Sequence, residues 1–290
     1  MVTNIGTPRW KLNAAYPFIF PSFFLLFLFV LLPLVLEFYL GLSEPTSSGF
    51  MFTGAKNIIY LVKDEIYNLT VRNTLFFLLI NTSVKFAAAL LAALALNRPF
   101  RGRKLVRALL VVPWALPEIS AYLAWRWLYD ANHGVLNYFL LTLGLIEQPV
   151  AFLAESGIAI YFVIWAQAWK YIPFYTLILL AALQSIPSVL YEAATIDGAN
   201  KLQIFRHITF PSIRTIFITT MTLSFVWTFG EFNSVWILTR GGPATSVLGT
   251  YAYVQTFILQ RINLGIAGFL IVLPLVLASV MLLIRLKIFR

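Results

Sequence analysis

Cysteine is missing from the 290-residue sequence, and histidine occurs only twice, as His133 and His207. A chain without cysteine forms no disulfide and offers no thiolate to a metal ion. Two histidines that lie far apart in sequence do not supply the ligands of a structural zinc site. We therefore expect no metal site, no catalytic site and no cofactor bound by this chain.

Charge is also scarce, because Asp, Glu, Lys and Arg make up 11% of the residues and hydrophobic residues 60%. A water-soluble domain has about 25% charged and roughly 45–50% apolar residues. So few charges cannot cover the surface of a soluble core, and the composition indicates an integral membrane protein. Helices are the expected spanning elements, because a helix satisfies its own backbone hydrogen bonds in lipid. The predicted fold class is therefore all-α.

A membrane-spanning helix needs about 20 mostly apolar residues, and six stretches of the sequence satisfy this requirement. Several contain proline, which membrane helices tolerate and which we expect to kink them. The predicted spans are Tyr16–Leu42, Thr74–Leu96, Ala108–Leu128, Gly157–Leu183, Ile213–Leu238 and Leu264–Ile284.

Six spans place both termini on the same side of the membrane, and the basic residues indicate which side. The segments on the side of the termini hold 13 Lys and Arg residues, whereas the opposite segments hold 5. Since basic residues favour cytoplasmic loops, we expect both termini in the cytoplasm and a multi-pass protein of the cytoplasmic membrane. This topology also accounts for the net charge of +10. Lipid is therefore an expected partner and nucleic acid is not.

The inner loop between the fourth and fifth spans is long and patterned, unlike a short connector. Pro187 near a first helical turn, with Ser185 and Ser188 as candidate caps, predicts a short helix over Val189–Asp197. Gly198 is suited to end this helix, because glycine adopts the left-handed conformation that follows many helices.

A second short helix is predicted directly after the first. Asn200 is a candidate cap for a helix over Lys201–Ile208, and Pro211 marks the start of the fifth span. The result is a helix–turn–helix on the cytoplasmic face, which is typical of a docking element for a cytoplasmic partner. A plain helix lying at the membrane interface is the alternative.

The same loop resembles a known motif. The loop follows the EAA motif, whose pattern is EAA-x3-G-x9-I-x-L-P. The matching residues, at the spacing of the motif, are Glu192-Ala193-Ala194, Gly198, Ile208 and Phe210-Pro211. This motif belongs to the permeases of binding-protein-dependent ABC importers. The departure is Phe210 in place of leucine, which keeps the position apolar.

Further patches resemble the carbohydrate branch of that family, the permeases related to the maltose and glycerol-phosphate systems. The resemblance runs from about Phe18 to the C-terminus, and the order and spacing of the patches carry it. These patches are Phe52-Thr53-Gly54 with Asn57 and Tyr60, Val112-Pro113-Trp114, Trp125-Arg126-Trp127-Leu128, Gly134-Val135-Leu136-Asn137, Trp169-Lys170 with Pro173-Phe174, and Leu238-Thr239-Arg240-Gly241-Gly242-Pro243.

The resemblance implies the transmembrane domain of a type I ABC importer, with both termini in the cytoplasm. It implies a second permease subunit, two ATP-binding subunits and an extracytoplasmic sugar-binding protein as partners. The chain has no G-x-x-x-x-G-K phosphate loop. ATP and magnesium are therefore expected on the partner ATPase, and this chain is not expected to be an enzyme. The expected organisation is an N-terminal part with the first span at 1–72, the transmembrane domain at 73–285 with the coupling loop at 184–212, and a tail at 286–290.

The resemblance places the contact that couples this chain to the ATPase subunit in the inner loop. The two alanines of the motif would let the ATPase surface approach the helix backbone closely, and the acid beside them would pair with an Arg or Lys of the partner. The residues expected in this contact are Tyr191, Glu192, Ala193, Ala194, Asp197, Gly198, Ala199, Phe205 and Pro211.

Charged and aromatic residues inside the spans are the candidates for the solute path. An ionisable residue within a membrane is costly and usually functional, and saccharide sites combine aromatic faces with polar groups. The candidates are Trp114, Glu118, Tyr122, Trp165, Trp227, Glu231 and Asn233. Packing is the alternative role for the three tryptophans.

Three further charges within the spans allow other interpretations. Lys85 is expected to pair with Glu118 or with another subunit. Arg126 and Lys170 are expected near helix ends, where long side chains reach the membrane surface.

Three rival functions fit parts of this pattern. A secondary transporter or channel working alone would explain the spans and the buried charges, but not the patterned inner loop. A membrane enzyme, such as a lipid-modifying transferase, would gather His, Asp or Glu at one interface, and the sequence shows no such constellation. An importer permease of the same fold that carries peptides, ions or amino acids differs only in its solute.

Overall fold

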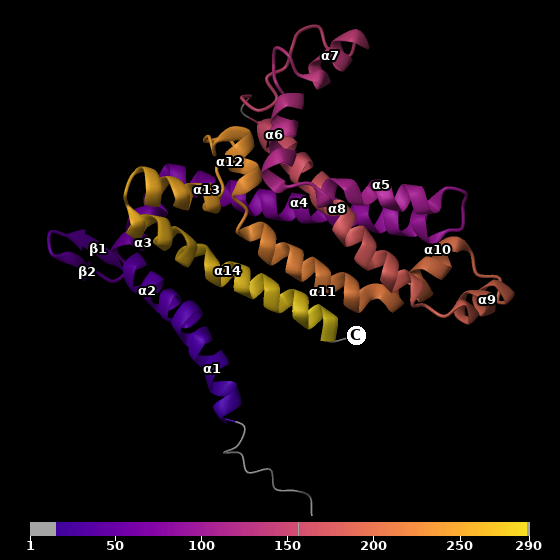
Figure 1. Ribbon diagram of the computed structural model, residues 1–290, viewed down its shortest axis with the longest axis horizontal. Helices are drawn as coiled ribbons and strands as arrows, with labels where there is room; N and C mark the ends of the chain where they lie inside the picture. Colours follow the sequence, from indigo (N-terminus) through magenta and orange to yellow (C-terminus); the bar gives the residue numbers. More distant parts are fainter. Residues whose placement is uncertain (1–15, 156, 289–290) are drawn as a thin grey trace, which may run out of the picture.

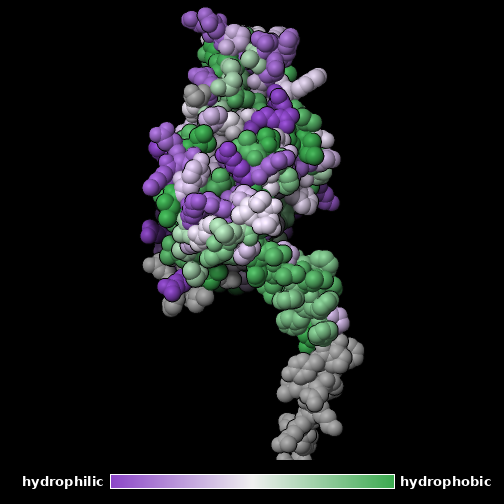
Figure 2. All heavy atoms as spheres, turned by 90° about the vertical axis from the view of Figure 1, so that its left-hand side faces the viewer, coloured by the Kyte–Doolittle hydropathy of each residue, from purple (hydrophilic) through white to green (hydrophobic). Residues whose placement is uncertain are grey.

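The computed structural model describes residues 16–155 and 157–288. The first span is one continuous helical segment made of α1 (Tyr16–Leu26), η2 (Phe27–Leu31) and α2 (Leu32–Gly41). Its α2 part packs against the last span, whereas α1 stands away from the rest of the molecule (Figure 1). Figure 2 shows that this projecting segment is hydrophobic on the face in view. Such a surface requires lipid or another apolar surface around it.

A two-stranded hairpin follows the first span, formed by β1 (Ser43–Thr46) and β2 (Gly49–Phe52). The strands are antiparallel, with Ser43 opposite Phe52. The all-α prediction missed this hairpin. The strands are four residues each, too short for an alternating pattern to identify them in the sequence.

Helix α3 (Lys56–Lys63) connects the hairpin to the bundle through the buried Asn57. The Asn57 amide donates to the carbonyl oxygens of Gly41 at 2.9 Å and of Ser43 at 2.8 Å. Its side-chain oxygen accepts a hydrogen bond of 3.2 Å from Asn263 in the last span. One side chain therefore holds the end of the first span, the hairpin and the last span together.

Three helices form the centre of the bundle: α4 (Glu65–Asn97), α8 (Ala159–Gln184) and α14 (Ile262–Ile288). Asp64 caps α4, because its carboxylate accepts the Tyr67 backbone N–H at 2.6 Å. Helix α4 lies along α8, and their shared core contains small fully buried residues such as Ala89. Small side chains allow membrane helices to approach closely, where packing replaces the hydrophobic driving force.

The third predicted span, 108–128, is not one helix. Helix α5 (Arg103–Ala115) and helix α6 (Glu118–Leu128) are bent by 95° at the break between them. Leu116 is extended, with φ −64° and ψ 143°, because the ring of Pro117 disfavours the helical conformation of the residue before it. The expected proline kink is therefore a complete break.

The fifth predicted span, 213–238, is also broken. Helix α11 (Phe210–Phe229) and helix α12 (Asn233–Thr239) are bent by 46° at Gly230–Phe232. Phe232 leaves the helical conformation with a φ of −133°. Among the described residues, the chain has three long straight spans, and six spans when each bent helix pair is counted as one.

The inner loop forms α9 (Ser188–Ile196) and α10 (Lys201–Ile204), which confirms the predicted helix–turn–helix. Gly198 lies between them with a φ of +75°. Asn200 and Gln203 form a capping box at the start of α10. The predicted serine caps are wrong, because Pro187 occupies the cap position of α9 and no side chain caps that helix.

The second short helix also differs from its prediction. It continues through η3 (Phe205–Thr209) into α11 without interruption, and Pro211 lies in the first turn of α11. Pro211 therefore lies inside a continuous helical segment, directly after a π-helical turn, and does not start a separate helix.

The remaining elements lie toward the outer end of the bundle. Helix α7 (Val135–Thr142) lies in the second outer segment, and α13 (Leu248–Tyr253) with η4 (Val254–Ile258) precedes the last span. Helices α6 and α7 project away from the bundle (Figure 1).

Candidate functional site

The first helix break places Glu118 at the start of α6, where its carboxylate is half-buried. One carboxylate oxygen accepts hydrogen bonds from the hydroxyls of Tyr122 at 3.3 Å and Tyr171 at 3.0 Å. The other oxygen accepts from the Asn233 amide at 2.9 Å. Glu118 is therefore joined to α8 and to the start of α12.

The second helix break places Glu231 beside α12, and its residue is only 9% exposed. One carboxylate oxygen accepts the backbone N–H and the hydroxyl of Ser234, both at 2.9 Å. The other accepts from the Gln167 amide of α8 at 3.1 Å. This carboxylate acts as an N-cap for α12, because it pairs with a backbone N–H that the first turn leaves free.

Two buried lysines lie beside these carboxylates. Lys170 is 4% exposed, and its ammonium donates to the Leu116 carbonyl at 2.7 Å, with the Pro113 and Trp114 carbonyls at 3.4 Å. The expectation that Lys170 reaches the membrane surface is therefore wrong. Lys170 lies in the middle of both the predicted span Gly157–Leu183 and α8 (Ala159–Gln184), not near a helix end.

Lys85 of α4 is 1% exposed and donates to the Thr228 hydroxyl at 2.8 Å. Its ammonium also lies over the rings of Tyr171 at 5.9 Å and Tyr175 at 5.6 Å, within the range of a cation–π interaction. The suggested pair with Glu118 is not formed in the described parts of the chain.

An aromatic row borders the polar groups. The Trp114 ring stacks on Phe174 with centroids 5.6 Å apart, and Phe174 contacts Trp227 at 6.1 Å. Trp114 and Trp227 are 44% and 53% exposed on this subunit. The packing role considered for them accounts for only part of each ring, so each tryptophan presents aromatic surface beside the polar cluster.

Six of the seven predicted path residues therefore lie at the two breaks: Trp114, Glu118, Tyr122, Trp227 and Asn233 share one network of hydrogen bonds and ring contacts, and Glu231 adjoins it with Gln167 and Ser234. Trp165 is the exception, because no hydrogen bond or ring contact in the described ranges joins it to this network. Their role in transport stays a prediction. We call the network and these adjoining residues the break cluster; it consists of Lys85, Trp114, Glu118, Tyr122, Gln167, Lys170, Tyr171, Phe174, Tyr175, Trp227, Thr228, Glu231, Asn233 and Ser234.

Sequence reasoning missed the contribution of α8, which supplies Gln167, Lys170, Tyr171 and Phe174. Their spacing of three, one and three residues puts them on one face of a helix. This spacing was the available signal. This spacing is hard to recognise in the sequence, because α8 has apolar residues on all sides, as a membrane helix requires.

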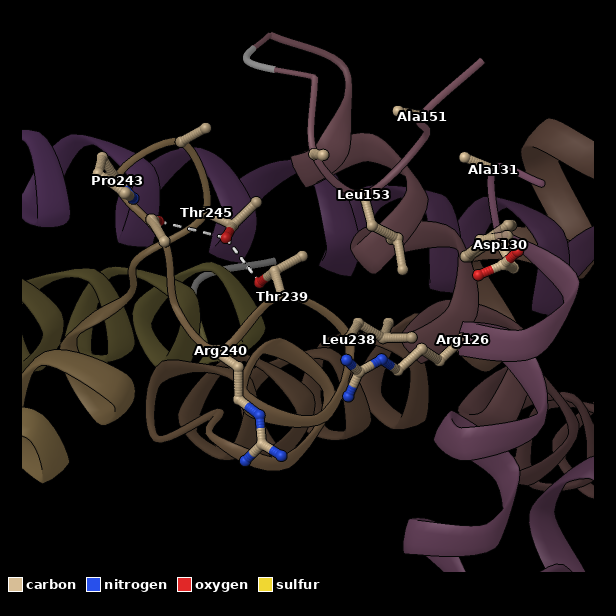
Figure 3. A pocket seen from close by; sticks show the side chains of 14 residues that line it. Arg126, Asp130, Ala131, Ala151, Leu153, Leu238, Thr239, Arg240, Pro243 and Thr245 are labelled. Atoms are coloured by element: carbon tan, nitrogen blue, oxygen red, sulfur yellow. Dashed lines mark hydrogen bonds between the residues drawn. The ribbon is translucent and has the colours of Figure 1, made fainter. Parts of the chain in front are cut away.

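A cleft of about 450 Å³ opens at the outer end, between α6, the 151–154 segment and the turn after α12 (Figure 3). Arg126 and Arg240 line it, and Arg126 donates to the Ile237 carbonyl at 3.3 Å. Arg240 has a φ of +58° and lies over the Trp236 ring. Arg126 is exposed in the cleft, and the expectation that it reaches the membrane surface stays a prediction.

Asp130 also lines this cleft, on the side of Arg126 and away from Arg240 (Figure 3). Its carboxylate accepts the backbone N–H groups of His133 at 2.8 Å and Asn132 at 3.0 Å. These two hydrogen bonds hold the pKa of Asp130 below its usual range. Asp130 therefore carries its negative charge at neutral pH and fixes the turn that leads to α7.

The predicted coupling residues lie around the α9–α10 turn. Glu192, Ala193 and Asp197 are exposed. The Tyr191 hydroxyl hydrogen-bonds to Thr209 at 3.2 Å, which fastens α9 to the base of α11. This hydrogen bond links α9 to the helical segment that leads to the second break.

Ala194, Ala199 and Phe205 are half-buried on the bundle side of the turn, and Pro211 is exposed. The exposed Glu192, Ala193 and Asp197 form the part of the turn that a cytoplasmic partner could contact. The contact itself stays a prediction.

A membrane bundle with broken spans and charged groups at the breaks is the architecture of a solute transporter. Residues 86–289 match the family described as the binding-protein-dependent transport system inner membrane component. This match covers more than half of the sequence, and the chain belongs to this family.

Individual relatives agree with this assignment. The chain is similar to the trehalose/maltose transport system permease protein MalF of Thermococcus litoralis, with 32% identity over 242 residues, 82% of this chain and 81% of the relative. It is also similar to the probable ABC transporter permease protein PH1215 of Pyrococcus horikoshii, with 30% identity over 265 residues, 89% of this chain and 91% of the relative.

A solved structure shares the fold. It is the crystal structure of a bacterial ABC transporter involved in the import of the acidic polysaccharide alginate, one chain of which matches with a TM-score of 0.80, 22% identity and 95% coverage of both chains. The predicted fold of a type I ABC importer transmembrane domain is confirmed. The chain is an integral membrane permease subunit of an ABC importer, and a stand-alone transporter or a lipid-modifying enzyme is set aside.

Proposed function

We propose that this permease forms the translocation pore for a di- or oligosaccharide or a related solute. The observation that carries this proposal is the break cluster. Trp114 and Trp227 present aromatic faces beside the hydrogen-bonding groups of Glu118 and Asn233. Sugars bind to such combinations, because their C–H faces pack on aromatic rings while their hydroxyls pair with carboxylates and amides.

The helix breaks support the same proposal. Polar groups within a membrane are tolerated where they line a cavity, and transporters place their solute sites at discontinuous helices. The named functions of two matches, trehalose/maltose transport and alginate import, favour a saccharide.

The coupling would run through the inner loop. A second permease subunit completes the pore, and two ATP-binding subunits carry ATP and magnesium beneath it in the cytoplasmic membrane. The exposed Glu192, Ala193 and Asp197 contact the ATPase, and Tyr191 transmits its closure to α11. An extracytoplasmic binding protein delivers the solute. The assembly alternates between inward-facing and outward-facing states by rigid-body movement of its parts.

Transport by the reconstituted assembly tests the proposal. The permease pair, its ATPase and its binding protein are placed in proteoliposomes, and ATP-dependent uptake is measured for maltose, trehalose, an acidic oligosaccharide and a panel of amino acids. Uptake of a saccharide supports the proposal. ATP-dependent uptake of an amino acid with no saccharide uptake contradicts the sugar assignment while leaving the importer assignment in place.

A further inference from the structure

Each of the two helix breaks carries a lysine on one side and a glutamate on the other. At the first break, Lys170 binds the carbonyls at the end of α5, and Glu118 is the first residue of α6. At the second break, Lys85 binds Thr228 in the last turn of α11, and Glu231 caps the first turn of α12. The two breaks therefore have the same arrangement of charges.

This arrangement matches the electrostatics of helix ends. The C-terminal end of a helix carries partial negative charge on its free carbonyls, and the N-terminal end carries partial positive charge on its free N–H groups. Each lysine lies at a C-terminal end, and each glutamate lies at an N-terminal end.

The lysines have no competing carboxylate contact. Within the described residues, neither Lys85 nor Lys170 lies within salt-bridge distance of an acid. Their close partners are carbonyl oxygens, a hydroxyl and tyrosine rings. The ammonium groups are therefore committed to the helix ends.

Helix α8 joins the two breaks. Gln167 donates to Glu231, and three residues later Lys170 reaches the end of α5. Tyr171 donates to Glu118, and its ring lies 5.9 Å from the ammonium of Lys85 and 5.9 Å from that of Lys170. A single face of α8 thus carries Lys170 and contacts Lys85 and both carboxylates.

We propose that Lys170 and Lys85 are positioning residues whose charge keeps the two spans broken and thereby sets where Glu118, Asn233 and Glu231 lie. For Lys170, the geometry identifies the free carbonyls of α5 as its target. Without the ammonium these carbonyls lose their donor, and α6 turns to a different angle so that water or another donor reaches them. The role in transport rests on the proposed function; the effect on the break does not.

The angle at the first break is measured by the distance between two spin labels. Leu109 on α5 and Leu123 on α6 are exposed, and because the sequence has no cysteine, cysteines introduced there are the only labelling sites on the chain. The full-length chain is purified in nanodiscs with the subunits that accompany it, whose own cysteines are replaced. The parent is expected to give one narrow distance distribution.

Lys170→Met is expected to shift or broaden this distribution, whereas Lys170→Arg keeps the charge and restores it. Lys104→Met on the exposed start of α5 is the matched control and is expected to leave it unchanged. A parent-like distribution in Lys170→Met overturns the proposal. If that variant does not fold, Lys170→Gln is measured, because it keeps a donor but removes the charge, and a parent-like distribution in it also overturns the proposal.

The second break is tested in the same way. Labels at Leu223 and Arg240 follow the bend between α11 and α12, and Lys85→Met is expected to change their distance, while a parent-like distance contradicts the role of Lys85. In transport assays, Lys170→Met should raise the solute KM, and Lys170→Arg should restore it. If the parent imports no sugar, the proposed function fails, but the two distances still decide whether the lysines hold the breaks.

Discussion

The Asn233 amide donates a hydrogen bond of 2.9 Å to the Glu118 carboxylate, across 115 residues of sequence. Each residue is the first of the helix that follows a break, α12 for Asn233 and α6 for Glu118. The bond therefore connects the two breaks directly, in addition to their common contacts with α8. Rotation of one outer half-helix must either carry the other with it or break this bond.

Asn233→Leu removes this connection while leaving Glu118 its two tyrosine donors. A hydrogen bond to a charged group contributes about 1.5–3 kcal/mol, so we expect the solute KM to rise by roughly tenfold or more. In a double-mutant cycle with Glu118→Gln, the two effects should be strongly non-additive, because both substitutions act on the same bond: the first removes its donor and the second removes the charge of its acceptor. Additive effects on KM would show that the bond does not act in the transport cycle.

Gly249→Ala should disturb the second break, because the added methyl group would clash with the backbone at Glu231. A Cβ at Gly249 would lie 2.4 Å from the Glu231 carbonyl oxygen, a backbone atom that cannot move aside easily. We expect a loss of folding yield and of transport, since overpacking typically costs about 1–3 kcal/mol. Gly230→Ala is the matched control, because its Cβ would meet nothing nearer than 4.0 Å. Thermal melting of both variants in detergent measures the difference, and equal melting temperatures would contradict it.

Gly198→Asp should separate ATP hydrolysis from transport. Gly198 has a φ of +75° between α9 and α10, and a side chain there is strained and stands in the proposed ATPase contact. The chain should still insert in the membrane, and Glu192→Lys should act similarly by reversing the exposed charge. The measurement is solute-stimulated ATPase activity of the reconstituted assembly. Normal stimulation in both variants would remove the coupling role from these residues.

Asn57→Leu should release the hairpin from the bundle. Asn57 makes three buried hydrogen bonds, to Gly41, Ser43 and Asn263, and leaving their partners unpaired costs about 1–3 kcal/mol each. The exposed Asn68 makes one bond, to the Val62 carbonyl, and Asn68→Leu is the control. Protease cleavage in the Thr46–Gly49 turn should become faster in Asn57→Leu alone. Equal cleavage rates in the two variants would rule out this anchoring role.

The number of spans and the inner helix–turn–helix could be predicted from the sequence because each depends on local signals. About 20 apolar residues define a span, and Gly198 and Asn200 have local conformational and capping preferences that the structure retains. The inner element was therefore predicted correctly except at Ser185 and Ser188, where Pro187 took the cap position, and at the end of its second helix, which continues into α11.

The breaks and the hairpin could not be predicted in the same way. Pro117 indicated a kink. The 95° angle, however, depends on the hydrogen bonds that Lys170 and Tyr171 of α8 donate to the end of α5 and the start of α6. Those partners lie more than 50 residues away in sequence, at separations of 54 and 53. For the same reason six path candidates were found by their chemistry, whereas the α8 residues that hold them were missed.

The central claim is that this chain works as the permease of an ATP-driven importer, and purification of its partners tests it most directly. The tagged chain is purified from its native membranes in mild detergent, and the accompanying proteins are identified and quantified by mass spectrometry. We predict that a second six-helix permease and an ATP-binding subunit are recovered in stoichiometric amounts, two ATP-binding subunits for each permease pair. Recovery of the chain alone, or only with copies of itself, would contradict the account.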